Sequence, residues 1–342
     1  MRKITRRSFL TAAMSCGAAA ALSACGGSTA SSAAASSVAS AASASGSAAG
    51  KKFTVGICQL VQHAALDAAT QGFEDALTDS FGEDVTFDFQ NAQGDSATCA
   101  TITNGFVSAG VDLIMANATP ALQAAQAATN DIPILGTSVT EYGVALGLTD
   151  FSGVVGGNIS GTSDLAPLDQ QADMITELFP DAKNVGILYC SGEPNSVYQA
   201  KVVKDCLEKK NIKVEVYTFA DSNDVSTVTS SACANSDVIY IPTDNTAASC
   251  TEAISAVALP AGVPIVAGEE GICKGCGVAT LSIDYYELGR TTGQMAVKIL
   301  KGEANVSEMP IEYYPNPVKK YNADIASKLN VTIPEGYTAI SD

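Results

Sequence analysis

Residues 183–201, KNVGILYCSGEPNSVYQAK, decide the fold of this chain. Residues 185–189 are apolar and rich in β-branched and aromatic side chains, which predicts a buried strand. After a polar turn, Pro194 suits the first turn of a helix, and Asn195 and Ser196 are residues that cap helices. A strand that leads into a helix in this way leaves N–H groups unpaired, and these suit an anion such as a carboxylate. An ordinary loop that only caps its own helix is the alternative. The apolar residues of one face of the predicted helix are Ala200, Val203, Cys206 and Leu207.

The same alternation of strand and helix runs through most of the chain. Residues 51–342 exceed what one small core usually holds, so we expect two lobes. Glycines cluster in residues 153–161, which we interpret as the crossing from one lobe to the other. The predicted fold is α/β, with two Rossmann-like lobes whose parallel sheets are joined by a hinge. The expected parallel strands cover residues 53–58, 85–89, 111–116, 132–135, 185–189, 213–219, 238–241 and, as the last before the Cys turn at residues 273–276, 263–267.

The N-terminus has the pattern of an exported lipoprotein. Residues 5–10, TRRSFL, form a twin-arginine motif, and a weakly apolar run follows that is too short for a stable transmembrane helix. The sequence LSAC at residues 22–25 resembles a lipobox, so we expect a signal peptide over residues 1–24 and lipidation of Cys25. The Ser-, Ala- and Gly-rich residues that follow, up to residue 50, cannot form a core and predict a disordered tether.

Composition excludes several classes of function. Of the 19 basic and 36 acidic residues, four basic ones fall in the signal peptide, which leaves a mature net charge of 15 − 36 = −21. This charge argues against binding to nucleic acid or to a membrane surface. The chain has one His and one C-x-x-C, at Cys273 and Cys276, which is too little for a zinc site. We expect that motif to be a surface turn, with a local disulfide left open, and we expect neither a metal nor a cofactor.

In open α/β sheets, ligands bind beyond the carboxyl ends of the strands, and polar turns follow many of the predicted strands here. These turns resemble those of the ABC-transporter solute-binding lipoproteins that bind tryptophan, tyrosine or phenylalanine. The matching stretches are GICQLVQHAALD (56–67), NAQGD (91–95), ATPALQAA (118–125), GTSD (161–164), LYCSGEPNS (188–196), IPTDNT (241–246) and DYYELGRTTGQMA (284–296). The family usually has Pro after the His, where this chain has Ala64.

The resemblance implies a type I periplasmic-binding fold with three crossover segments. It places residues 51–160 and about 283–308 in an N-terminal lobe. Residues 161–282 and about 309–342 then form a C-terminal lobe.

An amino acid ligand needs a site for its carboxylate and one for its ammonium group. Asn195 with Ser196, or Thr119 with Ser138 from the other lobe, are candidates for the carboxylate. Asp164, Asp244 or Glu269 are candidates for the ammonium, although Asp244 also suits a helix N-cap. His63 suits either a structural hydrogen bond or a ligand contact. The complete set of candidate ligand-binding residues is Gln59, His63, Thr119, Ser138, Asp164, Glu193, Asn195, Ser196, Asp244, Asn245 and Glu269.

Four aromatic residues are candidates for lining a ring pocket: Tyr142, Phe151, Tyr189 and Tyr240. For Tyr189 and Tyr240, a place in the core near a strand end is the alternative.

The function expected from the sequence is capture of a small solute, with an aromatic amino acid as the expected ligand, and its delivery to an ABC permease and its ATPase. The protein would be an extracytoplasmic monomer that meets the membrane only through its lipid. A ligand-binding co-receptor for a membrane sensor is an alternative, as is a binding protein for a nucleoside, a sugar or another amino acid. An enzyme is not expected, because the chain has no nucleophile elbow, P-loop, dinucleotide fingerprint or set of metal-spaced histidines.

Overall fold

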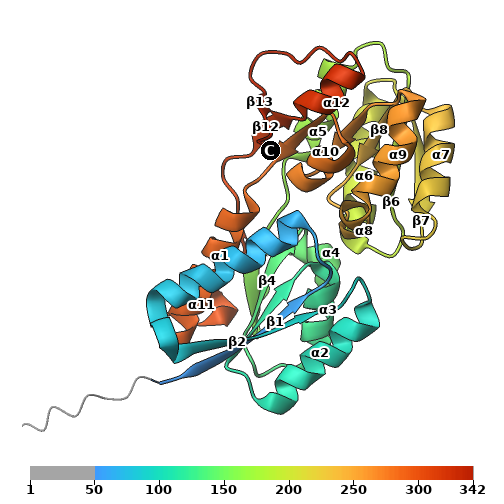
Figure 1. Ribbon diagram of the computed structural model, residues 1–342. Coiled ribbons are helices and arrows are strands. Elements are labelled where there is room, and N and C mark those ends of the chain that lie inside the picture. The colour runs from blue at the N-terminus through green and yellow to red at the C-terminus, as the bar shows by residue number, and fades with distance from the viewer. Residues whose placement is uncertain (1–50, 342) are drawn as a thin grey trace, which may run out of the picture. The chain divides into compact units, whose positions relative to one another are not determined.

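The structure is a computed structural model that describes residues 51–341 of the chain. The signal peptide, the lipidation site Cys25 and the tether predicted for residues 1–50 lie outside the described residues. The described part belongs to one compact unit and contains two sheets. We call each sheet, with the helices that cover it, the first and the second lobe (Figure 1). No helix in residues 51–341 combines the length and the apolar character that crossing a bilayer requires.

The sheet of the first lobe has six strands in the order β11-β5-β4-β3-β1-β2. All of its pairings are parallel. Its strands are β1 (Phe53–Gln59), β2 (Val85–Asn91), β3 (Leu113–Asn117), β4 (Ile134–Val139), β5 (Ile159–Ser163) and β11 (Glu312–Tyr313). The helices around it are α1 (Ala64–Phe81), α2 (Ser96–Ala109), α3 (Thr119–Ala128), α4 (Tyr142–Leu146) and α11 (Tyr285–Leu300), with 3₁₀ turns η1 (Gly82–Asp84) and η2 (Val306–Glu308).

The sheet of the second lobe has seven strands in the order β13-β12-β10-β9-β8-β6-β7. It is parallel except where β10 meets β12. Its strands are β6 (Asn184–Cys190), β7 (Lys213–Phe219), β8 (Val238–Ile241), β9 (Ile265–Ala267), β10 (Ala279–Ser282), β12 (Val318–Tyr321) and β13 (Thr338–Ala339). Its helices are α5 (Leu168–Leu178), α6 (Pro194–Lys209), α7 (Val225–Asn235), α8 (Asn245–Ser249), α9 (Thr251–Ala261), α10 (Glu270–Cys276) and α12 (Ala323–Lys328).

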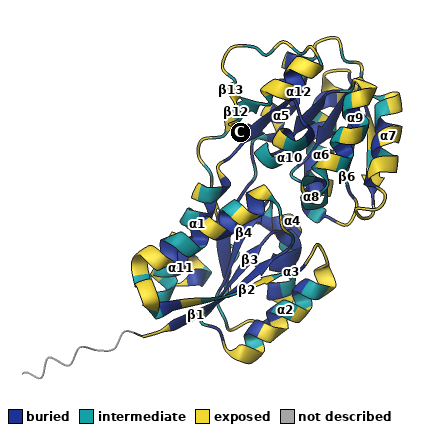
Figure 2. Cartoon of the chain, viewed as in Figure 1, coloured by how far each residue is buried: buried dark blue, intermediate teal, exposed yellow. Residues whose placement is uncertain are grey.

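Each sheet is covered by helices on both faces, so its strands are buried while the outer faces of the helices are exposed (Figure 2). In the first lobe, Phe73 and Leu77 of α1 pack with Met295 of α11 on one face of the sheet, and Phe106 of α2 packs with Leu122 of α3 on the other. The second lobe repeats this arrangement with two further clusters. These findings confirm the predicted α/β class with two mainly parallel sheets.

Helix α11 returns to the first lobe and lies against α1 at very short range (Figure 1). Glycines make this approach possible: a Cβ atom added to Gly289 would lie 2.0 Å from the carbonyl oxygen of Ala69, and one added to Gly72 would lie 2.1 Å from that of Tyr286. No side chain fits at such distances. Close backbone packing at these glycines therefore adds to the side-chain packing that holds α11 against the first lobe.

The chain passes between the sheets three times, and two of the passages come later than expected. Strand β5 still belongs to the first sheet, so the first crossing follows Ser163 instead of residue 160. Strand β11 pairs with β5, so the third crossing follows Tyr313 instead of about residue 308. The residues of β5 are mostly polar, so the sequence lacks the apolar run that indicates a buried strand. Hydrogen bonds inside the protein make this burial possible; the Thr162 Oγ1 atom, for example, lies 2.7 Å from Thr292 Oγ1.

Other local expectations were wrong. The C-x-x-C motif is not a surface turn: Cys273 and Cys276 lie on α10 with buried, free thiols. Asn195 and Ser196 do not cap α6, whose N-cap residue is Glu193.

Candidate functional site

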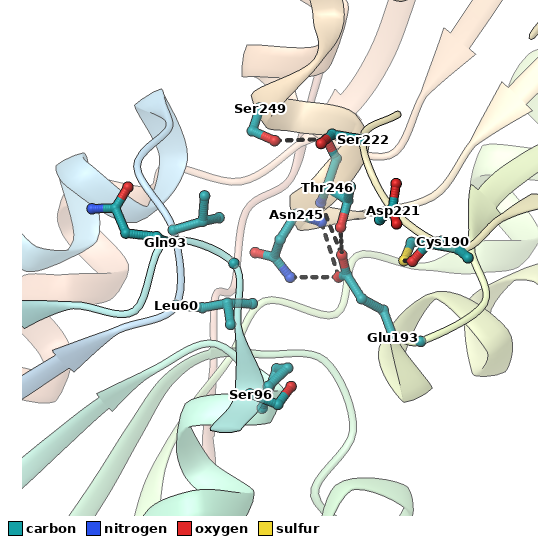
Figure 3. A pocket seen from close by; sticks show the side chains of 15 residues that line it. Leu60, Gln93, Ser96, Cys190, Glu193, Asp221, Ser222, Asn245, Thr246 and Ser249 are labelled. Carbon is teal, nitrogen blue, oxygen red and sulfur yellow. Dashed lines mark hydrogen bonds between the residues drawn. The ribbon is translucent and has the colours of Figure 1, made fainter. Parts of the chain in front are cut away.

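Two neighbouring cavities lie where the loops at the carboxyl ends of the strands of both lobes meet. The inner cavity has a volume of about 10 Å³ and the outer cavity one of about 320 Å³. Asn245 lines both. The inner cavity is lined by His63, Leu66, Ser138, Asp164, Asn195, Thr243, Asp244, Asn245, Ala248, Glu269 and Tyr285. Residues from both lobes also line the outer cavity, among them Leu60, Gln93 and Ser96 on one side and Glu193, Asp221 and Ser222 on the other (Figure 3).

Three buried carboxylates face the inner cavity: Asp164, Asp244 and Glu269. Burial raises the pKa of Asp164 to about 6, against the hydrogen bond from Tyr285. Burial likewise raises the pKa of Glu269 to about 7. The pKa of Asp244 is raised too, first by burial and then by the negative charge of Glu193. No Lys or Arg of residues 51–341 lines either cavity, so no basic side chain on the cavity walls compensates these carboxyl groups.

Local structure explains how two of these carboxylates are held. Asp244 is the N-cap of α8, and its Oδ1 accepts a hydrogen bond from Ala247 N at 2.7 Å. Its Oδ2 accepts bonds from Cys190 N and Ser196 Oγ, both at 2.7 Å. Glu269 is the N-cap of α10 and accepts from the backbone N–H groups of Gly271 and Ile272. Both residues therefore serve helix capping as well as the cavity.

Four buried polar atoms on the wall of the inner cavity have no hydrogen-bond partner in the described chain: His63 Nδ1, Ser138 Oγ, Asp164 Oδ1 and Asn195 Oδ1. Buried polar groups are normally paired, so an unpaired cluster indicates a place for a ligand. Ser138 also has φ 53°, in the left-handed region that β-carbon-bearing residues rarely adopt. Such strain is typical of functional sites.

The hydrogen bonds around these atoms decide which of them are acceptors. Asn195 Nδ2 donates to Thr243 O at 2.9 Å and Glu193 Oε2 at 3.1 Å, so Asn195 Oδ1 faces the cavity. Asp164 Oδ2 accepts from Tyr285 OH at 3.0 Å, which leaves Oδ1 free. Burial lowers the pKa of His63, so its ring is neutral near pH 7. The cavity is therefore lined mainly by acceptors, and it requires a donor.

Glu193 lines the outer cavity and accepts hydrogen bonds from another loop of the second lobe. Its Oε1 accepts from Thr246 N and Oγ1, both at 2.8 Å, and its Oε2 accepts from Asn245 Nδ2 at 2.7 Å and Asn245 N at 3.0 Å (Figure 3). The side chain is buried and both of its oxygens are occupied. Glu193 thus fixes the loop after β6 to α8, and its acceptor capacity is used within the protein.

Two hydrogen bonds join the lobes across the site. His63 Nε2 lies 3.2 Å from Asn245 Oδ1, and Gln199 Nε2 lies 3.4 Å from Thr140 Oγ1. His63 stands at the N-cap of α1 in the first lobe, whereas Asn245 begins α8 in the second. The His63–Asn245 pair adjoins the inner cavity, and Asn245 also borders the outer one.

The structure brings most of the residues predicted from the sequence to the two cavities. The inner cavity collects His63, Ser138, Asp164, Asn195, Asp244, Asn245 and Glu269, and the outer cavity is bordered by Glu193 and Asn245.

Gln59, Thr119 and Ser196 line neither cavity. Gln59 instead bonds within its own lobe to Asp67 and Thr70, and Ser196 donates to Asp244.

None of the four aromatic candidates lines the inner or the outer cavity. Tyr142 and Tyr240 are buried in the cores of the two lobes, and Phe151 and Tyr189 pack against those cores. Tyr285 is the one aromatic residue of the described chain that lines the inner or the outer cavity, and sequence reasoning missed it. Its position at the start of the helix after Asp284, within a stretch that matched the family, was the available signal.

Fold and site together define a two-lobed, ligand-binding protein of the solute-capturing type. The family model for ABC transporter substrate binding protein matches residues 54–341, so the chain belongs to this family, whose members bind solutes and are not enzymes.

Among curated proteins, the chain is 40% identical over 264 residues to the tyrosine-binding protein of Clostridioides difficile (strain R20291), covering 76% of both chains. A solved structure from Streptococcus pneumonia, an ABC domain in complex with L-Trp, has a TM-score of 0.80 and 32% identity, covering 84% of this chain and 100% of that one. A conserved domain protein from Vibrio cholerae has a TM-score of 0.81 and 33% identity, covering 85% and 100%.

Proposed function

We propose that this protein captures an aromatic amino acid between its lobes and delivers it to an ABC import permease. The observation that carries the proposal is the acceptor-lined inner cavity. His63 Nδ1, Asp164 Oδ1 and Asn195 Oδ1 are three buried acceptors without partners, and a primary ammonium group has three N–H bonds to give. The inner cavity has a volume of about 10 Å³, which is enough for one water-sized group such as an ammonium.

The acidic residues of the inner cavity also support a ligand with an ammonium group. A cavity with three buried carboxylates and no Lys or Arg among its described lining residues repels anionic solutes, such as phosphorylated sugars. An ammonium group supplies the opposite charge and allows a carboxylate to stay ionised out of water. Charge-assisted hydrogen bonds of this kind contribute about 1.5–3 kcal/mol each. Neutral nucleosides and sugars would leave this charge uncompensated, so the site favours an amine over those alternatives.

The carboxylate of the amino acid would meet the first lobe. Ser138 Oγ is buried, unpartnered and able to donate. The expectation that Asn195 and Ser196 hold the carboxylate loses support, because Asn195 presents an oxygen and Ser196 Oγ is used by Asp244. The preference for an aromatic side chain rests on the relatives, one called tyrosine-binding and another solved with L-Trp.

Calorimetry of residues 51–342 against the twenty amino acids tests the substrate. We expect saturable binding of Tyr, Trp or Phe with micromolar or tighter affinity, which corresponds to about 8 kcal/mol. Saturable binding restricted to non-aromatic amino acids would contradict the preference for an aromatic side chain but agree with the ammonium site. Binding of a sugar or nucleoside in place of every amino acid would reject the ammonium site itself.

The proposal places the protein on the outer face of the cytoplasmic membrane, as a monomer held by a lipid on Cys25. Replacing Cys25 by Ala should move the protein from the membrane fraction to the soluble exported fraction while leaving ligand affinity unchanged. A Cys16→Ala variant is the matched control, because Cys16 falls within the predicted signal peptide and should not alter fractionation. Membrane association that survives Cys25→Ala would contradict the anchor. Uptake assays in cells that lack the ABC permease proposed to receive the solute would separate transport from sensing.

A further inference from the structure

The outer cavity has a chemical character of its own. Its wall from the first lobe includes the apolar residues Leu60, Val61 and Pro120. Facing them across the cavity, the second lobe contributes polar groups, including Asp221 and Ser222 (Figure 3). A flat ring can pack against the apolar wall while a polar substituent on that ring meets the opposite wall.

The volume and position of the outer cavity fit the side chain of a ligand whose ammonium group occupies the inner cavity. About 150 Å³ is enough for a benzene ring in a protein, and the outer cavity has about 320 Å³. Asn245 borders both cavities, so the two are neighbours. Gln93, Ser96, Asp221 and Ser222 are exposed, which puts the far side of this cavity in contact with solvent.

The formal charge of the outer cavity is negative. Asp221 and Glu193 line it, and no Lys, Arg or His of the described chain does. Glu193 is fully bonded to Asn245 and Thr246. Asp221 has one oxygen, Oδ1, that accepts from Asn223 N at 2.8 Å and Asn223 Nδ2 at 2.9 Å, and no hydrogen bond within residues 51–341 involves its Oδ2. Asp221 is thus the acidic group that can meet a ligand.

We propose that the outer cavity is a side-chain subsite that accepts rings with neutral or cationic para substituents and rejects anionic ones, with Asp221 as a specificity-determining residue. This inference rests on the proposed function, because it requires an amino acid whose ammonium group occupies the inner cavity. The ring packs on Leu60, Val61 and Pro120, and its distal substituent lies near solvent. Tyrosine and its neutral derivatives therefore fit, whereas a ring that carries a carboxylate or phosphate meets like charge.

The test uses three derivatives of phenylalanine that have nearly the same size and differ in charge: 4-carbamoyl, 4-carboxy and 4-aminomethyl. Calorimetry at pH 7.5 should show tight binding of the carbamoyl compound, with the carboxy compound at least threefold weaker and the aminomethyl compound equal or tighter. The difference should shrink when salt is raised from 20 mM to 500 mM, because exposed charges are screened.

Asp221→Asn should reduce the carboxy-to-carbamoyl ratio of dissociation constants by about threefold. Asp169→Asn is the control, because Asp169 is exposed on α5 and lines neither cavity. Tyrosine binding with no binding of any para derivative would show that the ring is enclosed, and would overturn the subsite. Equal affinity for the three derivatives would overturn the charge selection. Failure of every aromatic amino acid to bind would instead reject the proposed function.

Discussion

His63 of the first lobe lies 3.2 Å, Nε2 to Oδ1, from Asn245 of the second, and the surroundings of Asn245 decide the direction of this hydrogen bond. Asn245 Nδ2 donates to the Glu193 carboxylate at 2.7 Å, so its Oδ1 is the atom that faces His63. The His63 ring must therefore donate from Nε2, and the neutral ring keeps Nδ1 as an acceptor on the inner cavity. One side chain thereby joins the lobes and presents an acceptor to the ligand.

His63→Ala should weaken amino acid binding by about tenfold, because it removes the interlobe hydrogen bond and one acceptor, each contributing about 0.5–1.5 kcal/mol. Most of the loss should appear as faster dissociation, measured by stopped-flow fluorescence or surface plasmon resonance. Gln62→Ala is the matched control, because Gln62 is the exposed neighbour and lines neither cavity. Unchanged affinity in His63→Ala would show that the contact serves the fold alone.

Asp164 and Asp244 face the same cavity, but the structure predicts different consequences of their loss. Asp164→Asn changes a carboxylate whose Oδ1 has no protein partner. We expect at least a tenfold loss of ligand affinity, equivalent to about 1.4 kcal/mol, without a lower melting temperature. Titration calorimetry and differential scanning fluorimetry measure the two quantities. A drop in melting temperature with full affinity would assign Asp164 to the structure.

Asp244→Ala should mainly destabilise the second lobe. Its carboxylate accepts from Cys190 N, Ser196 Oγ and Ala247 N, and removing it leaves those buried donors unpaired. We expect a loss of about 2–4 kcal/mol in the free energy of unfolding, measured by urea denaturation. If Asp244 acts chiefly on the ligand, urea stability will stay within about 0.5 kcal/mol of the unmodified protein while affinity falls.

The raised pKa values predict a pH dependence of stability with a defined sign. The pKa of Asp164 is about 6 in the folded protein, above its value in an unfolded chain, so the folded state binds more protons between the two values. Stability of the ligand-free protein should therefore be lost as pH rises from about 4 through 6, by at most about 3 kcal/mol for this residue. Glu269, with its pKa near 7, extends the loss to about pH 7.

Thermal melts of the protein and of Asp164→Asn between pH 4 and pH 8 check this dependence, and the variant should show the flatter profile. Because an ammonium ligand favours the ionised carboxylate, ligand affinity should rise with pH over the same range. Affinity that rises as pH falls would contradict the assignment of an ammonium to this cavity.

The packing of α1 on α11 gives a prediction that is independent of the ligand. Gly289→Ala would place a methyl group 2.0 Å from the Ala69 carbonyl oxygen, so the two helices must separate. We expect a loss of about 1–3 kcal/mol in the free energy of unfolding. Gly105→Ala, on the exposed face of α2, is the opposite control: nothing lies within 4 Å of its added Cβ, and it should stabilise the protein by about 0.5–1 kcal/mol. Equal effects of the two changes would disprove the close contact.

The sequence by itself determined the alternation of strands and helices, because local apolar periodicity and turn residues encode each element. The bounds of β7 and β8, at residues 213–219 and 238–241, could be predicted in this way. Sequence also predicted the turns that supply most of the inner cavity, because polar residues after buried strands gather at one edge of a parallel sheet.

Tertiary structure decided what each polar side chain does, because hydrogen-bond partners come from distant parts of the chain. Asn195 and Glu193 are two residues apart, yet one presents a free acceptor and the other is consumed by bonds to Asn245 and Thr246. Membership of β11 in the first sheet also depends on its pairing with β5, about 150 positions away, which local pattern does not encode. The acceptor-lined cavity exists only because loops from both lobes complete it.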